Sequence, residues 1–176
     1  HTLRYSPNGD LWYIDAADNI IFRFDKEGRT TGTIGTNPEP WTYLTHVYER
    51  GVPNKAALYQ ETDIGWSKDG SMFVADGYGN SRVAKYDKDG NFVKAWGERG
   101  AQPGDFNTPH SLVVDQNDVV YVADRGNSRI QTFDTEGNRK AVWNLPTAPW
   151  ALCLTTGPNQ VMFVGSVGRV YKMDLS

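Results

Sequence analysis

The chain lacks the features that mark several large classes of protein. It contains one cysteine in 176 residues, so no disulfide can form within it, and Cys153 lies in an apolar run where we expect a buried, inert thiol. No run approaches the roughly eighteen apolar residues of a membrane span, so we expect no such helix. Basic residues are not in excess. The formal net charge is −3 and Lys and Arg are scattered, which disfavours binding to RNA or any other nucleic acid.

One pattern occurs twice in the middle of the chain, at residues 72–90 and 120–137. Each copy has a short apolar run, a polar turn with Asp and Asn-Ser-Arg, an alternating apolar run, and an Asp-x-x-Gly turn. This order predicts strand, turn, strand and turn. Such a unit cannot bury its own apolar face and must stack on others of its kind, so the repeat predicts a β-propeller.

The propeller pattern extends over residues 1–176, which we interpret as one all-β domain or fragment of four-stranded blades. About four blades are visible, and the last lacks its fourth strand. We therefore expect part of a six-bladed ring, and part of a longer or processed protein, since the sequence opens on His1 without a signal-peptide pattern. Residues 36–61 break the pattern and predict an irregular insertion with a function of its own or a mobile flap.

Aligning the units on their turn aspartates reveals a shared slot at the start of the innermost strand of each blade. Two of the three histidines, His1 and His110, occupy this slot, fourteen residues before the aspartate of units one and three. The slot holds Thr62 in unit two and Trp150 in unit four. Converging imidazoles with one open position are typical of a catalytic zinc site, for which a further blade would supply a third histidine. Alternatively, the two histidines are polar lining residues, or His1 is a tag remnant.

Two further side chains are candidates for the same face. Tyr78 lies in a turn where the other units have Ala17 and Gly126, and that turn should lie above the slot histidines. Arg125 follows the turn aspartate of unit three and could receive a carboxylate; otherwise it is an exposed surface arginine. His46, in the insertion, is interpreted as a solvated loop residue. The recurring turn residues are interpreted as scaffold: Asp76, Asn80, Ser81, Arg82, Asp124, Asn127, Ser128 and Arg129.

The recurring Val-Ala-Asp, Asn-Ser-Arg and Phe/Tyr-Asp-x-x-Gly segments resemble the NHL repeat family over nearly the whole chain. Four segments are more specific and resemble the peptidylglycine α-amidating lyases. In chain order they are Asp76-Gly-Tyr-Gly-Asn-Ser-Arg82, Trp96-Gly-Glu98, Pro103-Gly-Asp-Phe106 and Pro109-His-Ser-Leu112.

The resemblance implies a six-bladed propeller that cleaves the C–N bond of peptidyl-α-hydroxyglycine to give an amide and glyoxylate. It implies zinc held by three histidines, of which His1 and His110 match two, and catalytic roles for Tyr78 and Arg125. Leu3 matches a residue that lends its carbonyl to a structural calcium ion. The third histidine and the family's paired cysteines are absent from this sequence, and the missing disulfides fit a bacterial relative.

Two functions follow as expectations. The first is a zinc-dependent lyase acting on a peptide or another small hydroxylated substrate. The second is a non-catalytic NHL propeller that binds a peptide or protein partner on its loop face. The family resemblance favours a secreted or periplasmic location, and the residues alone leave the compartment open.

Overall fold

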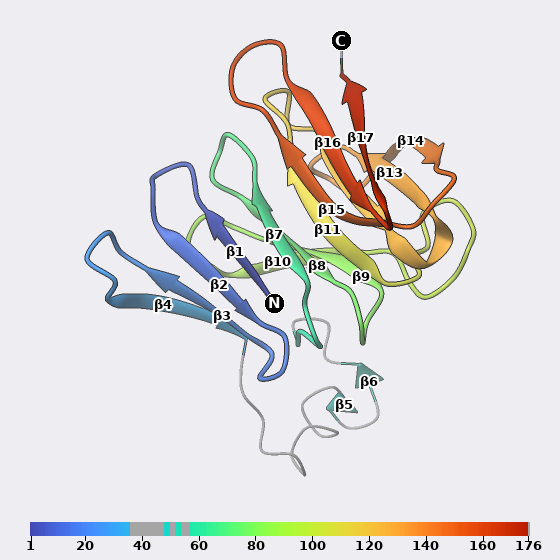
Figure 1. Ribbon diagram of the computed structural model, residues 1–176. Coiled ribbons are helices and arrows are strands. Elements are labelled where there is room, and N and C mark those ends of the chain that lie inside the picture. Colours follow the sequence, from blue (N-terminus) through green and yellow to red (C-terminus); the bar gives the residue numbers. More distant parts are fainter. Residues whose placement is uncertain (36–47, 50–51, 54–56, 176) are drawn as a thin grey trace.

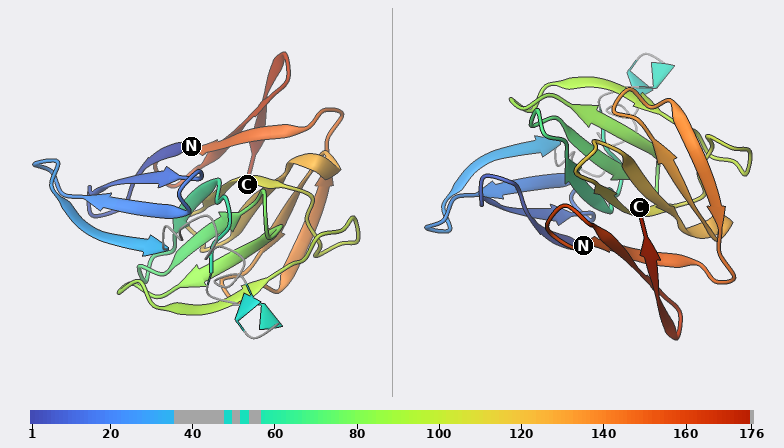
Figure 2. Two further views of the ribbon diagram at one scale, coloured as in Figure 1. Left: turned by 90° about the horizontal axis from the view of Figure 1, so that it is seen from below. Right: turned by 90° about the horizontal axis from the view of Figure 1, so that it is seen from above.

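The computed structural model describes residues 1–35, 48–49, 52–53 and 57–175. It is a β-propeller with four antiparallel blades, which confirms the predicted fold class. The blades stand side by side around their first strands, as Figures 1 and 2 show. None of the described residues forms a helix long and apolar enough to cross a membrane.

Each of the first three blades has four strands in chain order from the centre outward, and the fourth blade has three. Blade 1 has β1 (Thr2–Tyr5), β2 (Leu11–Asp15), β3 (Ile20–Phe24) and β4 (Thr30–Gly35). Blade 2 has β7 (Asp63–Trp66), β8 (Met72–Asp76), β9 (Arg82–Tyr86) and β10 (Phe92–Trp96). Blade 3 has β11 (Pro109–Val114), β12 (Val120–Asp124), β13 (Arg129–Phe133) and β14 (Arg139–Asn144), with a 3₁₀ turn η1 (Arg125–Asn127) after β12. Blade 4 has β15 (Pro149–Leu154), β16 (Val161–Ser166) and β17 (Arg169–Asp174).

The core lies between the blades rather than within them. One apolar cluster joins blades 1 and 2 through Ile14, Ile21 and Ile64, which are buried. Another joins blades 2 and 3 around Phe73 and Phe133, and a third joins blades 3 and 4. Because alternate residues of a strand point to opposite faces, each sheet contributes to the clusters on both of its sides. The stacking expected of a unit that cannot bury its own face is therefore present.

A polar network ties the innermost strands together. The Arg4 guanidinium donates to both carboxylate oxygens of Asp63, at 2.8 and 2.5 Å, and this carboxylate also accepts from Ser111 Oγ at 2.6 Å. Ser111 Oγ in turn accepts from the backbone N–H of Leu152 at 2.9 Å. The four residues come from β1, β7, β11 and β15, so the network fixes the first strands of all four blades relative to one another.

The recurring turn residues lie in buried networks. Asp76 and Asp124 are fully buried and pair with Arg82 at 2.9 Å and Arg129 at 2.6 Å. Both carboxylates accept a backbone N–H from the segment that leads into their blade. These bonds come from Tyr59 and Asn107, and the same carboxylates also accept from the side-chain amides of Asn80 and Asn127 in their own turns, at 2.7 and 2.8 Å. The arginines donate to carbonyls of the same inter-blade segments, for example Arg82 to Ala57 at 2.6 Å. These residues therefore join each blade to the preceding connection.

The cysteine prediction is wrong, because Cys153 is exposed. On β15, Leu152 is buried in the cluster between blades 3 and 4, so its neighbour Cys153 faces the opposite side of the sheet.

The expected insertion at 36–61 is described in part. It contains a two-stranded antiparallel sheet of β5 (Tyr48–Glu49) and β6 (Val52–Pro53), and residues 57–61 precede β7. His46 lies outside the described residues.

Candidate functional site

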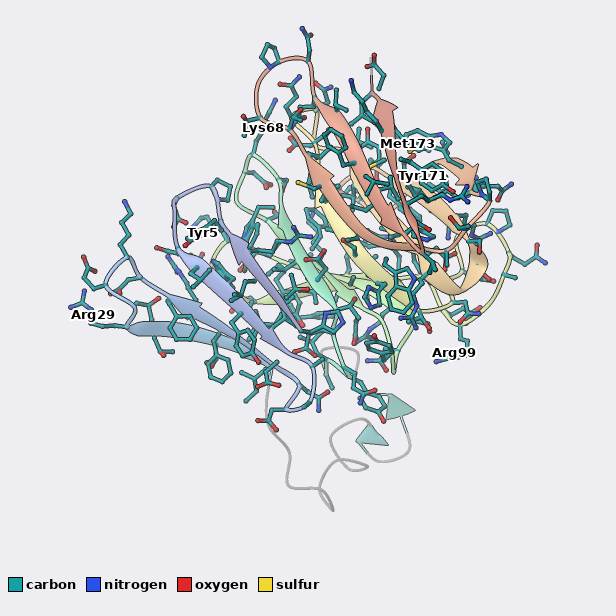
Figure 3. All side chains as sticks on the ribbon, in the orientation of Figure 1. Tyr5, Arg29, Lys68, Arg99, Tyr171 and Met173 are labelled. Atoms are coloured by element: carbon teal, nitrogen blue, oxygen red, sulfur yellow. The ribbon has the colours of Figure 1, made fainter. Side chains whose placement is uncertain are left out.

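Three segments meet at one end of the propeller: the N-terminus before β1, the loop between β8 and β9, and the η1 turn after β12 (Figure 1). Figure 3 places Arg99 at this end and Lys68, from the loop between β7 and β8, at the opposite end. We call this end the mouth and define it by His1, Tyr78, His110, Arg125 and Trp150. Four of these five residues were candidate site residues from the sequence. The fifth, Trp150, was noted only as the residue in the repeated slot of blade 4.

Both histidines of the mouth are oriented by the blade that follows them. Nδ1 of His1 lies 2.8 Å from the carbonyl oxygen of Thr62, and Nδ1 of His110 lies 2.8 Å from that of Trp150. A carbonyl oxygen only accepts hydrogen bonds, so each Nδ1 carries the proton and each Nε2 keeps its lone pair. This arrangement of a ring N–H bonded to a carbonyl is the one that supports histidine ligands of metals.

Tyr78 packs edge-on against the rings of both histidines. Its hydroxyl is 3.0 Å from His110 Nε2 and donates to that lone pair. The ring centroids of His1 and His110 are 4.9 Å apart, and that of Tyr78 is 5.8 Å from His1. The hydroxyl therefore stands at the nitrogen that faces the mouth.

Arg125 is a guanidinium held between two aromatic rings. It lies 4.3 Å from the ring centroid of Trp150 and 5.3 Å from that of Tyr78, and its Nη1 is 3.5 Å from the Tyr78 hydroxyl oxygen. Among the described residues no carboxylate pairs with it. A stacked arginine keeps its N–H edge free, so it can accept a carboxylate from a ligand.

The loop that bears Tyr78 is fixed by backbone contacts. The N–H of Tyr78 donates to the Gln60 carbonyl at 3.2 Å, and that of Gly79 to the Tyr59 carbonyl at 3.1 Å. A Cβ on Gly79 would lie 2.0 Å from the Tyr59 ring, so the close packing requires glycine there. Arg99 donates to the Tyr78 carbonyl at 3.2 Å. No sequence pattern selects Arg99, because its contact depends on the path of the loop between β10 and β11.

Two titratable groups near this end have shifted pKa values. Burial lowers the pKa of His110, which favours the neutral ring that can act as a ligand or acceptor. Burial, reinforced by the charges of Asp76 and Asp15, raises the pKa of Glu61 to about 8. Neither carboxyl oxygen of Glu61 has a hydrogen-bond partner on another described residue. Glu61 is thus an unpaired acid directly before Thr62, whose carbonyl orients His1.

The residues fit zinc in part and calcium less well. His1 and His110 supply two imidazoles whose Nε2 atoms carry the lone pair that a zinc site requires, and the one on His110 accepts the Tyr78 hydroxyl in this structure. Within the described ranges no three His, Cys, Asp or Glu side chains are grouped so as to hold a metal. Leu3 lies on β1 with its side chain exposed, and calcium needs six to eight oxygen ligands, so one carbonyl does not make a site. We assign no step to calcium.

Comparison with known proteins places these residues in a family context. Residues 106–133, which include His110 and Arg125, match the NHL repeat model. A probable peptidyl-α-hydroxyglycine α-amidating lyase of Caenorhabditis elegans is 34% identical over 156 residues, covering 83% of this chain and 41% of the worm protein. Human NHL repeat-containing protein 3 is 36% identical over 176 residues, covering 94% of this chain and 46% of the human protein. The chain thus spans less than half the length of either relative.

The structural comparison supports the fold alone. Virginiamycin B lyase from Staphylococcus aureus superposes with a TM-score of 0.63 at 14% identity, over 100% of this chain and 55% of that protein. The repeat match, the relatives and the blades agree with one another. The chain is an NHL-repeat β-propeller that is similar in sequence to the peptidyl-α-hydroxyglycine α-amidating lyases.

Proposed function

We propose that this chain carries the catalytic mouth of a zinc-dependent lyase that cleaves peptidyl-α-hydroxyglycine, or a close hydroxylated analogue, into an amide and glyoxylate. The observation that carries the proposal is the contact between the Tyr78 hydroxyl and His110 Nε2 at 3.0 Å, with Arg125 Nη1 beside the same hydroxyl at 3.5 Å. A base, an imidazole ligand and a carboxylate receptor are thereby within reach of one small ligand.

The reaction requires removal of one proton and departure of one nitrogen. Loss of the hydroxyl proton turns the C–O bond into the carbonyl of glyoxylate. The C–N electron pair leaves with the nitrogen, which takes up a proton and becomes the peptide amide. Bound at His1 and His110, zinc would acidify the substrate hydroxyl and polarise its oxygen.

The residues of this chain then have distinct tasks. Tyr78, if deprotonated, would accept the hydroxyl proton at its oxygen and hold it while the C–N bond breaks. The Arg125 guanidinium would stabilise the phenolate charge and bind the carboxylate of the substrate through its free edge. The Trp150 and Thr62 carbonyls would keep the histidine rings in place. Tyr78 can donate to His110 Nε2 only while that nitrogen holds no metal.

The test is an assay of the full-length protein, supplied with zinc, on an N-acylated peptide that ends in α-hydroxyglycine. We expect glyoxylate and the peptide amide in equal amounts. A protein that binds zinc but releases no glyoxylate above the spontaneous rate would refute the proposal.

The second candidate is a non-catalytic propeller that binds a peptide or protein at the mouth. The match to NHL repeat-containing protein 3 favours it. The aligned region covers 94% of this chain, and the name of that relative describes only the repeat. This candidate predicts that a peptide with a free C-terminal carboxylate binds and is recovered unchanged.

A further inference from the structure

Trp150 occupies the repeated slot that holds histidine in blades 1 and 3. It is 43% exposed, although it is among the largest apolar side chains of the protein. Its ring centroid lies 5.0 Å from that of His110 and 4.3 Å from the Arg125 guanidinium carbon. The start of β15 therefore places an indole where the start of β11 places a histidine, beside the proposed ligand of zinc and the proposed receptor of the carboxylate.

The polar residues of the mouth restrict where a ligand can lie. Its carboxylate is drawn to Arg125 and its hydroxyl to Tyr78, and these two groups are 3.5 Å apart. The short distance matches two groups carried by one carbon, as the carboxylate and hydroxyl of the terminal hydroxyglycine are. The acyl part of the ligand must extend past the other walls, and Trp150 contacts both Arg125 and His110.

The chemistry of this wall suits an apolar side chain. Tyr78 is half-buried and uses its hydroxyl on His110. The indole presents exposed apolar surface whose removal from water is favourable. Aromatic walls beside a few convergent polar groups are the usual composition of a site that selects small ligands.

We propose that Trp150 determines substrate specificity by binding a bulky apolar or aromatic side chain on the residue that precedes the terminal hydroxyglycine. The inference rests on the proposed lyase function and adds the substrate class to it.

The test compares two substrates that differ only at this residue, N-acetyl-phenylalanyl-α-hydroxyglycine and N-acetyl-glycyl-α-hydroxyglycine. We expect the full-length protein to prefer the first in kcat/KM, and Trp150→Ala to lower this preference about tenfold. Trp150→Phe should retain most of it. The matched control is Phe163→Ala, which removes an exposed aromatic ring from β16 of the same blade, outside the mouth. Its preference should equal that of the unmodified protein.

Three outcomes overturn the inference, and each leaves the proposed function standing. The first is an equal kcat/KM for the two substrates with the unmodified protein. The second is an equal fall in kcat/KM for both substrates in Trp150→Ala, and the third is the same loss of preference in Phe163→Ala as in Trp150→Ala.

If neither substrate is cleaved, the proposed function fails and binding decides the inference. Calorimetry with the unreactive probes N-acetyl-phenylalanyl-glycine and N-acetyl-glycyl-glycine should then show tighter binding of the first, lost in Trp150→Ala. Equal binding of the two probes would overturn it.

Discussion

The carbonyl oxygen of Trp150 accepts the Nδ1 proton of His110 at 2.8 Å, as the carbonyl oxygen of Thr62 accepts that of His1. In both pairs the acceptor is the slot residue of the next blade. The relation sets the tautomer of both neutral imidazoles and places the lone pair on their Nε2 atoms, of which that of His110 accepts the Tyr78 hydroxyl. The first three predictions depend on this arrangement.

Tyr78→Phe should abolish turnover and leave metal binding intact. The hydroxyl contacts only His110 and Arg125 among the described side chains, so its loss removes the base without disturbing the core. We expect kcat for glyoxylate release to fall by roughly 10²- to 10⁴-fold. Zinc content should equal that of the unmodified protein. A variant with near-normal kcat would exclude Tyr78 as the base.

His110→Ala should remove zinc from the full-length protein. We expect about one zinc per chain in the unmodified protein and a large loss in the variant, measured by elemental analysis after dialysis. His46→Ala is the matched control, because His46 is the histidine that the sequence assigns to a solvated loop. Equal loss of zinc in both variants would contradict a site at the mouth.

Arg125→Lys should weaken substrate binding more than it slows the chemical step. Lysine keeps the charge but lacks the planar edge that binds a carboxylate through two hydrogen bonds. We expect KM to rise about tenfold with a smaller change in kcat. Arg29→Lys, on an exposed turn of blade 1, should leave both constants unchanged. A fall in kcat at constant KM would instead assign Arg125 to the chemical step.

Glu61→Gln should stabilise the protein increasingly as the pH rises from about 5 to 8. The pKa of Glu61 is about 8 in the folded protein, well above its ordinary value of 4.5. Between these values the folded state holds a proton that the unfolded state has lost, so the free energy of unfolding falls as the pH rises. The slope is up to about 1.4 kcal/mol per pH unit, and glutamine does not titrate.

Urea denaturation at pH 5, 6.5 and 8 measures this trend. The difference between variant and unmodified protein should grow across the series, whereas Glu98→Gln, at an exposed position, should show no trend. A difference that stays constant with pH would mean that Glu61 is ionised in the folded protein.

Arg129→Ala should destabilise the fold strongly. The substitution leaves the fully buried Asp124 carboxylate without its cation and frees backbone carbonyls of the connection between blades 2 and 3. We expect a loss of about 3–5 kcal/mol in the free energy of unfolding. Arg29→Ala breaks exposed ion pairs with Asp25 and Glu27 and should lower the free energy of unfolding far less. Similar losses would indicate that the buried pair contributes little.

The sequence was most informative where a repeat could be aligned. The copies at residues 72–90 and 120–137 each predict two strands, and the structure places β8 and β9 in the first and β12 and β13 in the second, because alternation and turn residues define them. The apolar run around Cys153 has no alternation, so the face that each residue would take could not be determined. Trp150 was found in the slot, but its contacts with Arg125 depend on how blades 3 and 4 pack.

The orientation of each slot histidine relies on a backbone carbonyl, not on a side chain, of the next blade. Any residue supplies that carbonyl, whatever its side chain. The slot residue therefore differs between blades, threonine in blade 2 and tryptophan in blade 4, while the histidine before it keeps the same contact. Under the proposed function, the propeller would separate what holds the site in place from what the site selects, and new substrate preferences could arise one blade at a time.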